Sequence, residues 1–269
     1  MSEQHEESRG DGRGASGVLA RLAAVVADYA WAVARHARAL LAPRPPARYR
    51  EGDPTLPAVV LLPGVYETWH FLAPIAEALH RRGHRVLTVG GLGLNRRGIA
   101  WTADALLRAL ARRRPGAGYV LVGHSKGGLI GKAALLDDRA EALGVLGLVT
   151  VATPFGGARR ARYFVDPTIR ALLPGDATIR RLVAETRSDA RIVSVFGDFD
   201  LHIPDGSALR GAANVPVPVS GHFRVLARPE TIAAVAEGVA GLVAAAAGDA
   251  AAAHTAGPAA PAGSSEPAA

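Results

Sequence analysis

The chain has 269 residues, a net charge of +7, 49% hydrophobic residues and no cysteine. This length fits one α/β domain with appendages, which can bury a sizeable core without covalent staples. The lack of cysteine excludes disulfides, a thiolate nucleophile and cysteine-ligated zinc or iron–sulfur sites. The positive charge is almost entirely arginine, scattered in short clusters without a binding motif. We therefore predict no nucleic-acid partner.

The two ends of the chain differ in composition from the segment between them. Residues 1–17 are polar and glycine-rich, and residues 245–269 form an Ala/Gly/Pro/Ser tract. Both are predicted to be disordered tails, the second of low complexity. The first residues carry Glu3, Glu6 and Glu7, and no apolar stretch with a cleavage site follows. We expect no secretory signal and predict a cytoplasmic protein.

Residues 18–50 are predicted to form an amphipathic helix followed by a proline-rich linker. Apolar side chains recur at three- and four-residue steps, which is the periodicity of a helix, before three prolines end the pattern. We expect this helix to pack on the body of the protein. The alternative is weak peripheral contact with a membrane, because Trp31 and several arginines flank the apolar face. The recurring apolar residues are Leu19, Leu22, Val26, Tyr29, Val33 and Leu40.

Strand and helix patterns alternate through residues 51–244. Continuous apolar strands between helices predict a mostly parallel central sheet flanked by helices, an α/β fold. Residues 155–190 break the alternation and are rich in arginine, so we predict a short cap insertion above the sheet. The predicted strands are 58–62, 85–89, 119–122, 145–152, 192–196 and 215–219, and the predicted helices are 71–82, 99–113, 126–136 and 231–243.

The third predicted strand runs directly into Gly123-His124-Ser125-Lys126-Gly127, and a helix follows. A G-x-S-x-G pattern between a strand and a helix is typical of a nucleophile elbow. Gly123 and Gly127 make room for the sharp turn, because larger side chains there would collide with the adjoining elements. The turn also brings the Ser125 hydroxyl to the positive end of the helix. The pattern predicts a serine nucleophile.

A serine nucleophile needs a histidine base and a carboxylate that orients the base. On a strand–elbow–helix scaffold these follow the serine in the order acid, then histidine, each after a late strand. The last predicted strand leads to His222, which we predict to be the base. The preceding strand leads to a loop with three candidate acids, Asp198, Asp200 and Asp205.

Two backbone N–H groups are needed to stabilise the oxyanion of an acyl-transfer reaction. One comes from the residue after the serine, which is Lys126. The other comes from the loop after an earlier strand, where Pro63-Gly64-Val65 follows residues 58–62 and Val65 is the natural donor. The Lys126 side chain itself is predicted either to lie near the substrate mouth or to point to solvent.

With these motifs the chain resembles the α/β-hydrolase superfamily, in particular its small bacterial lipase and esterase branch, from about residue 56 to 243. The stretches Thr153-Pro154-Phe155-Gly156-Gly157 and Gly221-His222-Phe223 are similar to segments of those lipases. The resemblance implies Ser125 as nucleophile, His222 as base and Val65 and Lys126 as oxyanion donors. It also favours Asp200 as the acid over Asp198, because Asp-Leu-His-Ile-Pro resembles the Asp-x-x-Val-Pro run of related enzymes.

The chain departs from this branch at two positions. Pro63 stands where a histidine usually precedes the oxyanion glycine, and Lys126 stands where methionine or glutamine is commoner. The first change keeps the backbone donor but alters the hydrogen bonding around it.

We predict a serine hydrolase that cleaves carboxylic esters through an acyl-enzyme, with a small-molecule ester or lipid-like compound as substrate. No metal or other cofactor is implied. A thioesterase or acyltransferase would use the same residues, and a hydrolase-fold binding protein with little turnover is the alternative from another class. The sequence does not predict the oligomeric state.

Overall fold

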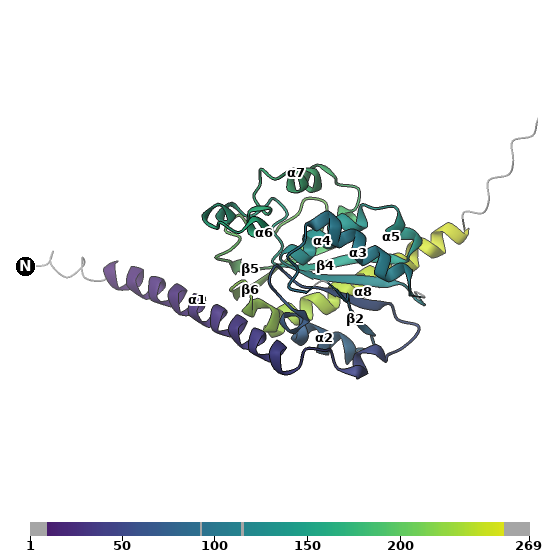
Figure 1. Cartoon of the computed structure of the whole chain (residues 1–269), viewed down its shortest axis with the longest axis horizontal. Helices are drawn as coiled ribbons and strands as arrows, with labels where there is room; N and C mark the ends of the chain where they lie inside the picture. Colours follow the sequence, from purple (N-terminus) through teal and green to yellow (C-terminus); the bar gives the residue numbers. More distant parts are fainter. Residues whose placement is uncertain (1–9, 92, 114–115, 256–269) are drawn as a thin grey trace, which may run out of the picture.

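The computed structural model describes residues 10–91, 93–113 and 116–255 (Figure 1). Its centre is a six-stranded sheet in the order β2-β1-β3-β4-β5-β6, and every neighbouring pair of strands is parallel. The predicted parallel sheet flanked by helices is thereby confirmed. The strands are β1 (Ala58–Leu62), β2 (Val86–Thr88), β3 (Tyr119–His124), β4 (Val145–Val151), β5 (Ile192–Phe199) and β6 (Ala213–Ser220).

Helices cover both faces of the sheet. Along β1, Val59 and Leu61 face one core, whereas Val60 and Leu62 face the other, because successive side chains of a strand alternate. The first core lies under α2 (Ala73–His80) and α8 (Pro229–Thr255), and the second lies under α3 (Ile99–Ala111) and α4 (Lys126–Leu135). Burial on both faces explains why the inner strands β1, β3 and β4 are mostly continuous apolar runs.

The two terminal helices are longer than the sequence predicts. Helix α1 (Gly10–Leu41) begins inside the segment predicted as an N-terminal tail, and α8 continues to Thr255, inside the predicted C-terminal tail. Alanine favours helix, which explains the extension of α8. The start of α1 is rich in glycine, so its extension follows only from the low cost of lengthening an existing helix by one hydrogen bond per residue. The rest of both predicted tails, residues 1–9 and 256–269, lies outside the described residues.

Helix α8 includes a stretch, Pro229–Asp249, that is long and apolar enough by length and composition to cross a membrane. One side of this stretch belongs to the core of the domain. Val235 and Val239 are fully buried, and both lie in the cluster that covers the sheet. The apolar residues on this side of the stretch therefore pack the helix on the sheet.

Helix α1 packs on the body of the protein, mostly through other side chains than those that the periodicity indicates; of the latter, Tyr29 contacts His202 and Phe223. Asp28 and Ala32 are buried and Trp31 is partly buried, and the helix contacts two short helical turns, η3 (Trp69–Phe71) and η6 (Arg224–Ala227). The N-terminal half of α1 projects away from the sheet (Figure 1). The predicted packing residues Leu22, Val26, Tyr29, Val33 and Leu40 are exposed.

The cap insertion lies between β4 and β5, as predicted, above the carboxyl ends of the strands (Figure 1). Ile179 and Leu182 of the cap are buried in the core next to α3 and α4, which fixes the insertion on the domain. Its elements are η4 (Arg159–Tyr163), α6 (Pro167–Arg170), α7 (Ala177–Ala184) and η5 (Asp189–Arg191), followed by β5.

Candidate active site

Ser125 occupies a tight turn between β3 and α4. Its backbone angles are φ 50° and ψ −120°, a conformation that side-chain-bearing residues rarely adopt. The flanking glycines allow this turn. A Cβ at Gly123 would lie 2.6 Å from the nitrogen of Gly128, and a Cβ at Gly127 would overlap the carbonyl oxygen of Leu62. The local sequence thus places the serine hydroxyl at the carboxyl edge of the sheet.

Three of the predicted residues meet at this edge. His222, from the loop after β6, lies with its Nε2 3.1 Å from the Oγ of Ser125. Its Nδ1 lies 2.7 Å from the Oδ2 of Asp200, which follows β5. The other oxygen of Asp200 accepts the backbone N–H groups of His202 (2.7 Å) and Ile203 (3.1 Å). The carboxylate is thereby held in one orientation toward the imidazole.

The other candidate acids lie elsewhere. Asp198 is exposed on β5, and the exposed Asp205 pairs with Arg159 of the cap (2.7 Å). His202 contacts the site differently from His222, with its ring stacked at 4.5 Å on that of His222 and its Nε2 3.0 Å from the hydroxyl of Tyr29. Burial lowers the pKa of His202 to about 3, so this ring is neutral.

The ionisation of the pair favours an anionic Asp200 beside a basic His222. Burial opposes the charge of Asp200, but the attraction of His222 and the hydrogen bond to it lower the Asp200 pKa to about 2. Burial by itself would lower the pKa of His222. The charge of Asp200 and the hydrogen bond to it raise the pKa, and the charges of Glu67 and Asp28 raise it further. Together they outweigh burial, so the His222 pKa lies above its usual value.

The two predicted oxyanion donors flank the serine. Lys126 is the first residue of α4, so its N–H lies at the positive end of that helix. Val65 lines the same pocket as Ser125, in the loop after β1. This loop is fixed by Glu67, whose carboxylate accepts the N–H of Gly64 at 2.7 Å, and the Pro63 carbonyl accepts the side-chain amide of Asn95 at 2.7 Å.

The side chain of Lys126 lies neither at the substrate mouth nor in solvent. It is 2% exposed, and its Nζ donates to the carbonyl oxygens of Asn95 (2.8 Å) and Arg97 (2.6 Å). Burial lowers its pKa to about 8. The ammonium group thus fastens the loop after β2 to the elbow.

Two buried carboxylates beside the site are not identifiable from the sequence. Glu67 pairs with His124 (2.8 Å), whose Nε2 lies 2.9 Å from the carbonyl oxygen of His222. Asp28 of α1 accepts the backbone N–H of His222 at 2.9 Å. Glu67 lies two residues after the predicted donor Val65, and Asp28 lies on a helix whose polar face is ordinarily assigned to solvent.

A pocket of about 470 Å³ opens above Ser125 and His222, and its size is in the range of small-molecule sites. Helix α1 contributes Tyr29, Ala32 and His36 to its wall, and the cap contributes the opposite side. Most of the lining is apolar, so the pocket is suited to a hydrocarbon group. Apolar side chains in it include Val65, Phe71, Ile169, Leu172, Ile203 and Phe223.

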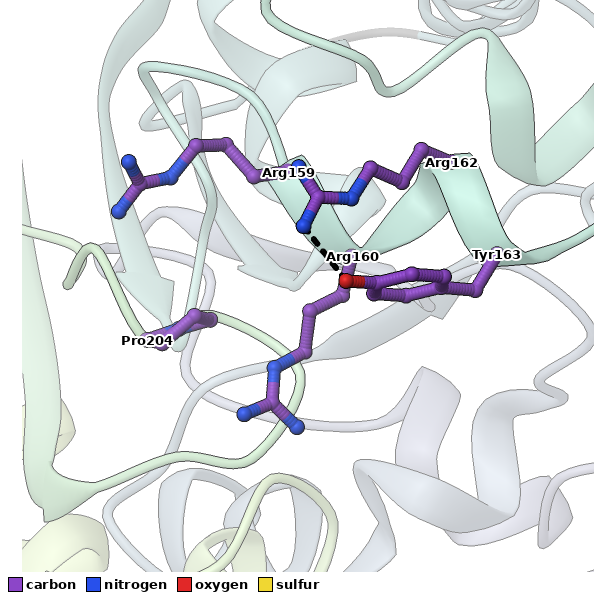
Figure 2. Close-up of a pocket in the computed structure, with 5 residues that line it drawn as sticks. All are labelled: Arg159, Arg160, Arg162, Tyr163 and Pro204. Atoms are coloured by element: carbon purple, nitrogen blue, oxygen red, sulfur yellow. Dashed lines mark hydrogen bonds between the residues drawn. The ribbon is translucent and has the colours of Figure 1, made fainter.

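A second pocket, also of about 470 Å³, borders the cap and is rich in arginine (Figure 2). Figure 2 shows Arg162 directed at the hydroxyl of Tyr163, which it approaches to 2.5 Å. Arg160 lines this pocket and the apolar one above Ser125, and it has no acidic partner within the described part of the chain. Its guanidinium group leaves a positive charge between the two pockets.

Asp200, His202 and His222 could each offer a ligand atom to one metal ion, because these atoms lie within 4.8 Å of one another. In the structure the Nδ1 of His222 and the Oδ2 of Asp200 instead bind each other. Their arrangement fits the orientation of a base by a carboxylate without requiring a metal.

No family profile and no curated protein matches this sequence. Among solved structures, the fold is similar to the metagenomic carboxyl esterase MGS0156, with 18% identity, a TM-score of 0.51 and coverage of 73% of this chain and 78% of that one. It is also similar to Est1E from Butyrivibrio proteoclasticus, with 16% identity, a TM-score of 0.52 and coverage of 71% and 90%. Lipase B of Aspergillus fumigatus has 15% identity and a TM-score of 0.52, with coverage of 71% and 54%. These similarities, together with the parallel sheet, show that the chain has the α/β-hydrolase fold.

Proposed function

We propose that the protein is a serine hydrolase that cleaves carboxylic esters through an acyl-enzyme. The observation that carries this proposal is the continuous contact from Ser125 Oγ to His222 Nε2 (3.1 Å) and from His222 Nδ1 to Asp200 (2.7 Å). The contact lies at the floor of an apolar pocket. Such an arrangement activates a hydroxyl nucleophile and stabilises the imidazolium that forms when the base takes its proton.

In the proposed reaction, Ser125 Oγ attacks the ester carbonyl carbon while His222 Nε2 takes the hydroxyl proton. The N–H groups of Val65 and Lys126 hold the oxyanion. His222 returns the proton to the alcohol as it leaves, and an acyl group remains on the serine oxygen. Water then attacks the acyl carbon, again losing a proton to His222, and the carboxylic acid is released with Ser125 regenerated.

The proposal is tested by hydrolysis of p-nitrophenyl esters of increasing acyl length, with wild type beside Ser125→Ala. Removing the nucleophile of such a unit lowers kcat by about 10⁴- to 10⁶-fold. Ser188→Ala is a matched control, because the Ser188 hydroxyl is buried without a hydrogen-bond partner among the described residues and does not line the pocket. Equal hydrolysis by wild type and Ser125→Ala would show that the nucleophile assignment is wrong.

The same residues would also serve a thioesterase or an acyltransferase, and the comparison of leaving groups separates these activities. Acyl thioesters of matched chain length are assayed beside the oxygen esters, with and without an added alcohol as acceptor. Faster turnover of the thioester, or formation of a new ester, would replace ester hydrolysis as the proposed reaction. Labelling of Ser125 by a fluorophosphonate without turnover of either substrate class would favour a binding protein.

The exposed apolar stripe on α1 supports weak peripheral membrane contact as part of this proposal. Val26 and Val33 are 69% and 66% exposed. Exposed apolar side chains on a helix bind at the membrane interface when their burial outweighs the cost of ordering. Sedimentation with phosphatidylglycerol vesicles tests this, and Val26→Asn with Val33→Asn should reduce the bound fraction.

A further inference from the structure

Three consecutive backbone N–H groups of the loop after β6 point at one carboxylate from the opposite end of the chain. Asp28 of α1 accepts the N–H of His222 through Oδ2 at 2.9 Å. Its Oδ1 accepts the N–H groups of Phe223 (2.9 Å) and Arg224 (2.7 Å). Asp28 is 4% exposed, so water has little access to replace these bonds. The carboxylate therefore fixes the backbone at the histidine and at the two residues that follow it.

The glycine before the histidine makes this approach possible. Gly221 has a φ of +115°, and a Cβ at this position would lie 2.7 Å from the Oδ1 of Asp28. Any other residue would be strained in this conformation and would push the loop off the carboxylate. The close contact between α1 and the loop therefore depends on a residue of each: Asp28 on the helix and Gly221 in the loop.

The carbonyl group of His222 is held from the other side of the site. It accepts a hydrogen bond from the Nε2 of His124 at 2.9 Å. Together with Asp28 at the N–H, this contact fastens both polar backbone groups of His222. The two ring nitrogens meet Ser125 and Asp200. A shift of the loop would move all of these atoms relative to the serine hydroxyl.

We propose that Asp28 is a positioning residue for His222: its carboxylate holds the backbone of the loop where the imidazole meets both Ser125 and Asp200. Helix α1 is then a part of the active site and not an appendage to it. This inference rests on the proposed function, in which His222 is the base. Proton transfer needs donor and acceptor within hydrogen-bond reach, and a misplacement of about 1 Å costs about 100-fold in rate.

Asp28 acts on His222 through charge as well as through geometry. Its negative charge is one of the influences that raise the pKa of the imidazole, so a neutral side chain there should lower that pKa. A purely structural contact would change stability without moving the titration. The other charged or titratable groups facing His222 are Asp200 and His202 from the loop after β5, Glu67 from the loop after β1 and His124 from β3.

The test is Asp28→Asn, which keeps the size of the side chain but turns an amide NH₂ toward one of the three backbone donors. We expect kcat on a p-nitrophenyl ester to fall by about 10- to 100-fold with little change in KM. The acid limb of kcat/KM should move to lower pH. The matched control is Asp189→Asn, which removes a buried carboxylate paired with Lys132 (2.7 Å) away from the site. This control should lower the melting temperature and leave kcat and the acid limb unchanged.

Titration of the His222 imidazole by NMR gives a readout that does not need turnover. In Asp28→Asn the titration of His222 should move to lower pH relative to wild type. A folded Asp28→Asn protein with wild-type kcat and an unmoved titration overturns the proposal. If the wild type hydrolyses no ester, the proposed function fails, and the NMR shift still decides whether Asp28 controls His222.

Gly221→Ala disturbs the same contact from the side of the loop. It is the second test, used if Asp28→Asn does not fold. Its methyl group displaces the loop while the carboxylate stays in place. The expected result is a loss of kcat comparable to that of Asp28→Asn at unchanged KM. Full activity of a folded Gly221→Ala protein would show that the contact with Asp28 does not position the histidine.

Discussion

Glu67 and His124 form a fully enclosed pair beneath the candidate active site, with Oε1 2.8 Å from Nδ1 and with 3% and 0% of their side chains exposed. The Glu67 carboxylate also accepts the N–H of Gly64, next to the proposed oxyanion donor. His124 reaches the carbonyl oxygen of His222 with its Nε2. This pair therefore connects the loop after β1 to the loop after β6. Glu67 lies 155 residues and Gly64 lies 158 residues before His222 in the sequence.

Glu67→Gln should destabilise the protein by about 1–3 kcal/mol, because an amide has one acceptor oxygen in place of two and leaves His124 or the N–H of Gly64 buried without its hydrogen-bond partner. The measurement is urea unfolding at neutral pH. Glu77→Gln is the comparison, since Glu77 pairs with Arg48 at the surface and exposed pairs contribute at most about 1 kcal/mol. Equal losses in the two variants would contradict a special role for the buried pair.

The acid limb of the pH dependence of kcat/KM should have an apparent pKa above the ordinary pKa of a histidine. His222 accepts a proton only when it is neutral, and Asp200 raises its pKa in spite of burial. Half-maximal kcat/KM on the acid side is therefore expected above about pH 6.5, with activity lost as pH falls through this value. Asp200→Asn removes the main cause of the shift and should move the limb to lower pH while lowering kcat. A limb that stays in place would contradict the assignment of Asp200 as the orienting acid.

The strands could be predicted because burial on both faces makes them continuous apolar runs, as in residues 58–62, where prediction and structure agree to the residue. Ser125 and His222 could be located because each follows a predicted strand with a glycine at the turn, although β6 before His222 is a largely exposed edge strand. Asp28 could not, since it lies 194 residues from His222 and only the tertiary structure brings them together. The apolar periodicity of α1 was misleading for the same reason. Asp28 and Ala32 of this helix are buried on the body with Trp31 partly buried beside them, whereas Leu22, Val26, Val33 and Leu40 remain exposed.

Arg160→Gln should discriminate between neutral and anionic substrates. Its guanidinium group lies between the apolar pocket and the arginine-rich pocket of Figure 2, without an acidic partner in the described ranges. We expect kcat/KM for a hexanoyl ester of glycerol 3-phosphate to fall about tenfold, which is the contribution of one charge-assisted hydrogen bond. The hexanoyl ester of glycerol should be unaffected.

Arg170→Gln is the matched control for this comparison, because Arg170 is an exposed cap arginine that lines neither pocket. It should change neither rate. A similar loss with both variants would indicate a general effect of surface charge. No loss with Arg160→Gln would show that this guanidinium group does not contact the phosphate of the substrate.

Gly127→Ala should abolish activity and destabilise the fold, because its methyl group would overlap the carbonyl oxygen of Leu62 on β1. The backbone of α4 would have to move away from the sheet at the point where it carries Ser125, and such overpacking costs about 1–3 kcal/mol or more. Gly241→Ala makes the same chemical change on α8, where the new methyl group would meet no atom of the described residues within 4 Å apart from its chain neighbours and its own helix backbone. Alanine is the better helix former by about 1 kcal/mol, so this variant should be slightly more stable than wild type and fully active. Thermal unfolding and ester hydrolysis of the two variants measure both effects. An active, stable Gly127→Ala protein would mean that the elbow does not constrain the serine as its backbone geometry indicates.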